Sequence, residues 1–329
     1  MDEIKNYKAT IAARVQEHYD YLVAAGYEVV FTALQGSQNY GLDEYSNEYQ
    51  SDVDTKSVIL PSLEDFIRAK PPISTTIVLD NEEHAEVKDI RVMFEMFKKE
   101  NISYIELLYS DYIVFNPKYE ELIKPIFNYR DKIATADTTQ FLKCIAGMAY
   151  EKNKALCHPY PGIIEKIEKY GYDGKQLSHC VRLHEFITRF AAGTPVAAVY
   201  KTNKRELLMN YKKQLNEEGL PLSKDEAIAL SEFYCAEVKC IKDKLIKENN
   251  YEVDKAAALF LDEIKANILK FKITEDVRAD MIINVKNLGK WMVENIVKKD
   301  DDFEKKQQEM IDRIKVSPLN NFWDYYKEK

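Results

Sequence analysis

Two short segments decide the fold: residues 28–37, which read EVVFTALQGS, and residues 51–60, which read SDVDTKSVIL. Each holds a run of β-branched and apolar residues, which is typical of a buried strand. The first run ends in a Gly-Ser pair, and the second is opened by two aspartates with one residue between them. The sequence therefore predicts strands over 28–34 and 53–60, with a turn after one and acidic side chains before the other.

The segments around these two strands complete a small sheet with helices beside it. Apolar residues recur at spacings of three and four over residues 2–25, which predicts an amphipathic helix. Ser62 is a suitable N-cap for a short helix that follows the second strand. The other elements predicted for this part are a helix over 62–70, strands over 73–79 and 84–88, helices over 89–99 and 102–109, and an apolar run over 112–115.

Helical periodicity dominates from about Tyr119 to the end of the sequence. With 329 residues, the chain exceeds the size at which a single core usually stops growing, so two domains are expected. We predict an α+β fold, with a small mixed β-sheet domain and flanking helices over residues 1–130, and a mainly α-helical domain over 131–329. The helices predicted for this second domain cover 139–153, 162–170, 175–192, 204–215, 224–247, 255–270, 274–298 and 303–315.

Composition limits the classes of function. The formal net charge of −8 disfavours a nonspecific binder of nucleic acid, because the overall field repels a polyanion. The five cysteines form no CxxC pair, which argues against a disulfide framework and a structural zinc site. No apolar leader or stretch of membrane-spanning length is present in the sequence. We therefore expect a cytoplasmic protein with no membrane partner.

The Gly-Ser pair and the two aspartates together predict a site for phosphate and metal. A Gly36-Ser37 turn exposes backbone N–H groups and a hydroxyl, which suit a phosphate. Asp52 and Asp54 lie two residues apart on a strand and so point the same way. Two adjacent carboxylates favour a hard cation, Mg²⁺ or in its place Mn²⁺, which usually takes further oxygens from substrate phosphates. Alone, each motif is also compatible with an ordinary turn or a solvated strand edge.

These motifs resemble a known signature. Residues 36–42 (GSQNYGL) followed by residues 51–54 (SDVD) are similar to the pattern of the bacterial and phage nucleotidyltransferases linked to RNA repair, a branch of the DNA polymerase β superfamily. The resemblance covers about residues 30–195. Departures are an apparent insert over 45–50, Lys56-Ser57 where Arg-Gly is common, and Ile102 in place of a proline. The resemblance continues in residues 89–91 (DIR), 101–108 (NISYIELL), 171–175 (GYDGK) and 178–183 (SHCVRL).

The resemblance implies a third acidic residue on a neighbouring strand, which would help to hold a second metal ion and accept the proton of the attacking hydroxyl. Asp89 occupies the acidic position before Ile90-Arg91, and Glu86 is the alternative. Asp89 could instead only cap the helix that follows it.

A second candidate group comes from the predicted helix over 175–192. Lys175, His179 and Arg182 fall at i, i+4 and i+7 and share one face of that helix. With the resemblance, they become candidates for contacts to the triphosphate of a nucleotide. A solvated face with local ion pairs is the ordinary alternative.

The resemblance implies a metal-dependent nucleotidyltransferase that moves a nucleoside monophosphate from an NTP such as ATP to an acceptor hydroxyl and releases pyrophosphate. Gly36 and Ser37 would hold phosphates, and Asp52 and Asp54 would bind the metal. The RNA-repair association favours an RNA end as acceptor. A nucleotide-binding module, an enzyme that modifies proteins or small molecules, and a helical scaffold stay open as alternatives, as do the oligomeric state and the role of residues 200–329.

Overall fold

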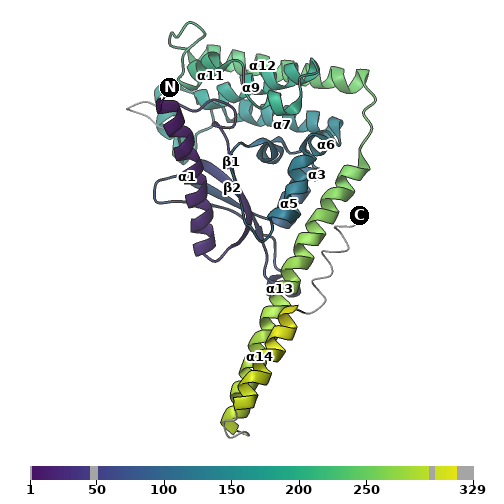
Figure 1. Cartoon of the computed structure of the whole chain (residues 1–329). Helices are drawn as coiled ribbons and strands as arrows, with labels where there is room; N and C mark the ends of the chain where they lie inside the picture. Colours follow the sequence, from purple (N-terminus) through teal and green to yellow (C-terminus); the bar gives the residue numbers. More distant parts are fainter. Residues whose placement is uncertain (1, 45–50, 296–300, 317–329) are drawn as a thin grey trace. The chain divides into compact units, whose positions relative to one another are not determined.

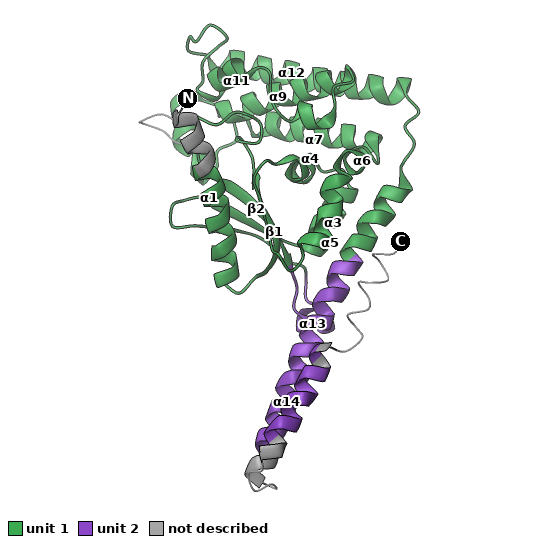
Figure 2. Cartoon of the chain, in the orientation of Figure 1, with its two compact units in different colours: residues 1–59, 72–265 green, residues 60–71, 266–329 purple. Residues whose placement is uncertain are grey.

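The computed structural model describes residues 2–44, 51–295 and 301–316. The apparent insert over 45–50 lies outside the described residues. The chain divides into two compact units, unit 1 with residues 1–59 and 72–265, and unit 2 with residues 60–71 and 266–329 (Figure 2). The predicted boundary at residue 130 falls inside unit 1, because the sheet and the helices α5 to α12 belong to the same unit.

The described residues form one five-stranded sheet in the order β3-β4-β2-β1-β5. β2 runs parallel to β4, whereas β3 is antiparallel to β4 and β5 is antiparallel to β1. The sheet is therefore mixed, and the predicted α+β class is confirmed. The strands are β1 (Glu28–Gln35), β2 (Asp54–Leu60), β3 (Ser74–Val78), β4 (His84–Asp89) and β5 (Ile113–Phe115).

Helix α1 (Asp2–Ala24) packs along one face of the sheet, with α3 (Ile90–Lys98) and α5 (Glu120–Asn128) on the other side in Figure 1. Leu22 of α1 is fully buried in a cluster with Ala85 and Val87 of β4. Because strand side chains alternate, His84 and its even-numbered neighbours on β4 point to the face away from α1. This alternation decides which acidic side chains can share a site.

A layer of helices in unit 1 surrounds α9 (Gly174–Ala191), which contacts α7 (Thr138–Ala155), α11 (Arg205–Lys212) and α12 (Lys224–Glu248). Most α9 side chains are buried, so the helix is fixed on several sides. The short elements of unit 1 are α4 (Ile102–Ile105), η1 (Glu106–Tyr109), α6 (Arg130–Ala134), η2 (Pro161–Ile163), α8 (Ile164–Tyr170) and α10 (Val196–Val199).

Unit 2 contains α2 (Leu63–Ile67) and α14 (Asp301–Val316), and α13 (Lys255–Asn295) runs from unit 1 into it. Ser62 caps α2 with a reciprocal capping box, as the sequence predicts. The two helices predicted over 255–270 and 274–298 form one continuous helix as far as Asn295, because Ile273 and Thr274 weaken a helix without breaking it, and 296–298 lie outside the described residues. Among the described residues, no helix has the length and apolar character needed to cross a bilayer.

Candidate functional site

The Gly-Ser turn directly follows β1. Gly36 has a φ of +86°, a conformation that side chains with a Cβ rarely adopt, so glycine is required there. The Ser37 carbonyl accepts hydrogen bonds from Tyr40 N–H at 3.1 Å and from Leu42 N–H at 2.9 Å, which close the turn. Within the described ranges, neither the Ser37 N–H nor its hydroxyl has a hydrogen-bond partner. Ser37 therefore offers two free donors at this turn.

Glu106 of η1 stabilises the Gly-Ser turn through two hydrogen bonds. Its buried carboxylate accepts the Gly36 N–H at 3.3 Å and the hydroxyl of Tyr40. Burial raises the pKa of Glu106. The Gly36 N–H is thus engaged inside the protein, which corrects its predicted role as a phosphate donor. Sequence reasoning passed over Glu106, although a single acidic residue inside the apolar run 105–108 was an available signal.

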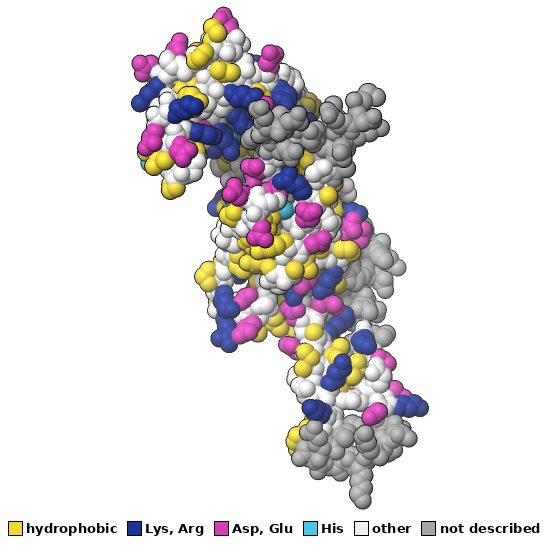
Figure 3. All heavy atoms as spheres, turned by 90° about the vertical axis from the view of Figure 1, so that its left-hand side faces the viewer, with side chains coloured by type: hydrophobic (Ala, Val, Ile, Leu, Met, Phe, Trp, Pro, Cys, Tyr) yellow, Lys and Arg dark blue, Asp and Glu magenta, His cyan; other side chains and the backbone are white. Residues whose placement is uncertain are grey.

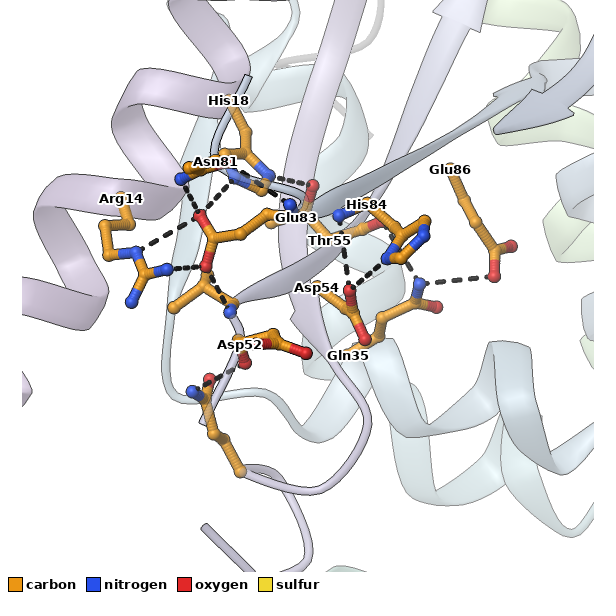
Figure 4. Close-up of polar contacts among 12 residues, drawn as sticks. Arg14, His18, Gln35, Asp52, Asp54, Thr55, Asn81, Glu83, His84 and Glu86 are labelled. Carbon is orange, nitrogen blue, oxygen red and sulfur yellow. Dashed lines mark hydrogen bonds and ion pairs between the residues drawn. The ribbon is translucent and has the colours of Figure 1, made fainter. Parts of the chain in front are cut away.

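The predicted acidic pair lies at the start of β2. Val53 is fully buried, while Asp52 is exposed and the Asp54 side chain is 39% exposed, so the two carboxylates project to the solvent side of the chain. Figure 4 shows both side chains, with the Asp54 carboxylate beside His84. Asp54 Oδ1 accepts the His84 N–H at 3.3 Å and lies 3.2 Å from His84 Nδ1. The remaining carboxylate oxygens are available to a cation.

Asp89 does not join this pair, which corrects its prediction as the third metal ligand. In the parallel register Thr55 lies beside Ala85 and Ile59 beside Asp89, so Asp89 is five residues, or roughly 16 Å, further along the sheet than Asp54. The alternation on β4 also places it on the α1 face. Its buried carboxylate caps α3 through the Arg91 N–H at 2.8 Å and pairs with the Arg91 guanidinium at 2.7 Å. The helix-cap interpretation is the correct one.

Glu86 lies on the same face of β4 as His84, two residues further along the strand. The amide of Gln35 links it to β2, because Gln35 Nε2 lies 3.2 Å from both Glu86 Oε1 and the Thr55 carbonyl (Figure 4). Lys56 and Lys88 neutralise Glu86, with their Nζ atoms 3.4 and 3.6 Å from its carboxylate. Of the two acidic residues that the sequence suggested, Glu86 is the one on the face of Asp54.

A cavity of about 630 Å³ unites the predicted motifs. Both aspartates and the Gly-Ser turn line it, and α9 contributes Lys175 and His179. Helices α8 and α11 add side chains that the sequence did not predict, Lys166 and Lys212, with Lys213 directly after α11. In Figure 3, lysine and arginine side chains gather over the upper, helical part of unit 1. The cavity size is typical of small-ligand sites.

Gly174 explains how α9 and α11 come so close. A Cβ at this position would lie 2.3 Å from the Tyr211 carbonyl oxygen, which is too close for any other residue. The first turn of α9 therefore packs directly on the backbone at the end of α11. This contact brings Lys175, in the first turn of α9, beside Lys212, which ends α11.

The basic side of the cavity carries several lysines, most of which have no ion-pair partner in the described parts of the chain. Lys166, Lys175 and Lys212 form no ion pair with any residue in the described parts of the chain, whereas Lys213 pairs with Glu44 at 2.5 Å. Burial, followed by the charge of Lys175, lowers the pKa of Lys212. Like charges held close together are destabilising, and Glu44 and Asp52 offset this only in part at Lys212, so this side is suited to a bound polyanion.

His179 and Arg182 have different places in this arrangement. His179 lines the cavity, and burial together with the neighbouring cations lowers its pKa well below the usual value, so it is a neutral hydrogen-bonding group at pH 7. Arg182 is buried one turn further along, with its guanidinium 3.8 Å from the centre of the Tyr40 ring. The structure thus brings two of the three predicted α9 residues into the cavity and places Arg182 behind Tyr40.

The carboxylates fit a magnesium ion that shares its ligands with a substrate. Among residues 2–44, 51–295 and 301–316, no group of three or more His, Cys, Asp or Glu side chains is arranged to hold a metal by itself. Mg²⁺ commonly binds through one or two carboxylates and completes its shell with phosphate oxygens and water. Asp52 and Asp54 meet this requirement, provided that phosphate oxygens reach them from the lysine-lined side.

No protein-family model matches this sequence, and it has no significant match among curated proteins. Function must therefore be inferred from the cavity and its side chains.

Proposed function

We propose that this chain is a magnesium-dependent nucleotidyltransferase that transfers a nucleoside monophosphate from an NTP to an acceptor hydroxyl. One observation carries the proposal: a single cavity of about 630 Å³ combines an outward-facing aspartate pair, the free donors of Ser37, and three lysines that form no ion pair within the described part of the chain. A ligand that satisfies all three must carry several negative charges and bring its own metal ligands. A nucleoside triphosphate with Mg²⁺ meets this description.

The lysine side of the cavity would bind the polyphosphate. Lys175 and Lys212 supply positive charge, and Ser37 donates its N–H and hydroxyl to the terminal phosphates. His179, which is neutral, donates one further hydrogen bond. Because burial and mutual repulsion already lower the pKa of Lys212, a bound polyanion removes an existing penalty and raises that pKa again.

The aspartate side would hold the metal and the reacting phosphate. Bound there, Mg²⁺ would neutralise charge on the α-phosphate and polarise the attacking hydroxyl. Asp52 and Asp54 would keep the α-phosphate in line with the acceptor. The hydroxyl oxygen forms a bond to the α-phosphorus, the bond to the bridging oxygen breaks, and pyrophosphate leaves. The hydroxyl proton passes to a carboxylate, for which we assign Glu86, the acidic residue on the Asp54 face of β4, which lies outside the residues that line the cavity and would have to be reached by the acceptor.

We assign an RNA end as the acceptor class. Its support is the resemblance of residues 36–42 and 51–54 to nucleotidyltransferases linked to RNA repair. The net charge of −8 is compatible with this acceptor if contacts are confined to the basic side of the cavity.

The test incubates the protein with each NTP labelled at its α-phosphate, Mg²⁺, and either total RNA or total protein. Wild type is compared with Asp52→Asn and with Asp225→Asn, a matched change at an exposed aspartate in the first turn of α12. We expect label in RNA, a loss on the order of a hundredfold or more in Asp52→Asn, and no loss in the control.

Other results of this test would reject different parts of the proposal. Equal rates for wild type and Asp52→Asn would reject the assignment of the metal site. Binding of NTP without transfer to any acceptor would indicate a nucleotide-binding module, and label in protein would move the acceptor class away from RNA. A chain that binds no NTP with Mg²⁺ would leave a scaffold role.

A further inference from the structure

A buried carboxylate lies directly behind the aspartate pair. Glu83, at the turn before β4, is 1% exposed and receives hydrogen bonds from several directions (Figure 4). Arg14 Nε donates to it at 3.1 Å and its NH2 group donates to the other oxygen, while Asn81 Nδ2 donates at 2.7 Å. The turn is fixed in return, since the Glu83 N–H donates to Asn81 Oδ1 at 3.2 Å.

The same carboxylate accepts the backbone N–H of Val53, the residue between the two aspartates. Val53 is also fully buried against Val15 and Leu34. The backbone that carries both carboxylates is thus fixed from behind by a charged acceptor and by apolar packing. A backbone held in this way fixes the positions and directions from which the Asp52 and Asp54 side chains leave the chain.

His18 of α1 extends this connection into β2. Its Nε2 lies 3.1 Å from the Glu83 carboxylate and its Nδ1 lies 2.9 Å from the hydroxyl of Thr55, the residue after Asp54. Because an ionised carboxylate only accepts hydrogen bonds, Nε2 carries the proton and Nδ1 accepts the Thr55 hydroxyl. Val53 and Thr55 are therefore both tied to Glu83, one directly and one through His18.

We infer that Glu83, together with Arg14 and His18, is a positioning group that fixes the separation and direction of the Asp52 and Asp54 carboxylates for metal binding. The inference rests on the proposed function, because it concerns the metal ligands of that site. Glu83 does not line the cavity and would touch neither metal nor substrate. It acts through the Val53 peptide and the Thr55 side chain. Outer partners of this kind commonly alter metal affinity or activity by ten- to a hundredfold.

Asp89 offers a matched control. Like Glu83, it is 1% exposed, pairs with one arginine and accepts one backbone N–H, in its case that of Arg91. It lies at the far end of β4, where it pairs with Ile59 of β2, far from residues 53–55. A purely structural contribution of a buried ion pair should therefore be similar for both residues, whereas an effect on the aspartate pair should be specific to Glu83.

The experiment measures binding of Mn²⁺ by electron paramagnetic resonance, with the metal alone and with ATP present, for wild type, Glu83→Gln, Asp89→Asn and Thr55→Val. Urea unfolding of each variant gives its stability. We expect the dissociation constant of Mn²⁺ to rise roughly tenfold in Glu83→Gln and about two- to threefold in Thr55→Val. Asp89→Asn should lose stability and keep the wild-type dissociation constant.

Two results would overturn the inference: an unchanged Mn²⁺ affinity in Glu83→Gln and Thr55→Val, or an equal loss in Asp89→Asn. Thr55→Val keeps the Glu83 cluster intact and serves if Glu83→Gln fails to fold. Failure of the proposed function is distinguishable, because metal binding is read without turnover. A wild-type chain that binds Mn²⁺ and transfers no nucleotide would reject only the reaction, while one that binds no Mn²⁺ would reject both.

Discussion

Replacement of Glu100 by glutamine should stabilise the protein at neutral pH. Glu100 follows α3 and is 1% exposed. Its Oε1 accepts the Asp137 N–H at 3.2 Å, whereas Oε2 has no hydrogen-bond partner among the described residues. Burial raises the pKa of Glu100 to about 8 from its ordinary value of 4.5. The native protein must therefore hold a proton on this group, or bury an unpaired charge, where the unfolded chain would be ionised.

The size and sign of the effect follow from this difference. Between pH 4.5 and about 8 the native state binds more protons at Glu100 than the unfolded chain, so stability is complete below this window and falls as pH rises through it. At pH 7 the chain has passed about 2.5 of these pH units, each worth about 1.4 kcal/mol. The cost is thus on the order of 3 kcal/mol. Glutamine keeps the shape and the acceptor for Asp137 N–H but removes the titration.

The assay is urea unfolding of wild type and Glu100→Gln at several pH values from 5 to 8, followed by circular dichroism. We expect the stability difference in favour of the variant to widen steadily with pH. If the stabilities of wild type and variant changed with pH in parallel over this range, Glu100 would ionise in the folded protein as easily as in the unfolded chain. Its environment would then not be apolar. A variant that is less stable than wild type at pH 8 would contradict the reasoning outright.

Three further outcomes are expected. Burial lowers the pKa of His18 to about 4 from 6.5, so the wild-type protein should lose stability as the pH falls from 6.5 to 4. Between pH 7 and pH 4.5, the loss of unfolding free energy in urea should be smaller in His18→Gln than in wild type, by on the order of 3 kcal/mol. Lys212→Gln should weaken the binding of ATP with Mg²⁺ roughly tenfold and flatten its salt dependence in calorimetry. Leu22→Ala, which empties a fully buried position between α1 and the sheet, should cost about 3 kcal/mol in urea unfolding without changing ATP affinity.

Local pattern was sufficient to predict the elements that carry the site. The β-branched run of β1, the strand β2 and the cap at Ser62 all depend on neighbours in sequence, and all are confirmed, although β2 begins at Asp54 and leaves Asp52 just before the strand. The domain boundary predicted at residue 130 does not coincide with the boundary between the two observed units. The change from mixed to helical periodicity is real, yet α9 and α11 pack into the same unit as the sheet, and such packing leaves no local signal.

The identity of the third carboxylate shows the same limit. Asp89 and Glu86 differ by three residues, an odd number, so they lie on opposite faces of β4. The choice between them depends on the register of β4 against β2, which pairs Lys56 with Glu86. Sequence spacing fixes neither the pairing partner of a strand nor its register. The resemblance favoured Asp89, whose carboxylate instead caps α3.

The hidden supports of the site were also beyond a linear reading. Glu83 and Glu106 lie 30 and 70 positions away from the backbone N–H groups whose hydrogen bonds they accept. Each could equally have been a solvated surface residue. The lysines at the end of α11 reach the cavity only because Gly174 allows two helix ends to meet, a contact that the sequence marks merely with one small residue.

That meeting of helix ends has a consequence for the chain as it is synthesised. The aspartate pair and the serine turn leave the ribosome about 160 residues before the part of the cavity that carries Lys212 and Lys213. Until that part arrives, the growing polypeptide has the acidic half of the cavity and only part of its basic half, because Lys166 and Lys175 are made earlier. Capture of a nucleotide should therefore begin only when translation has passed the end of α11, and fragments that stop before it should ignore nucleotides even if their sheet is folded.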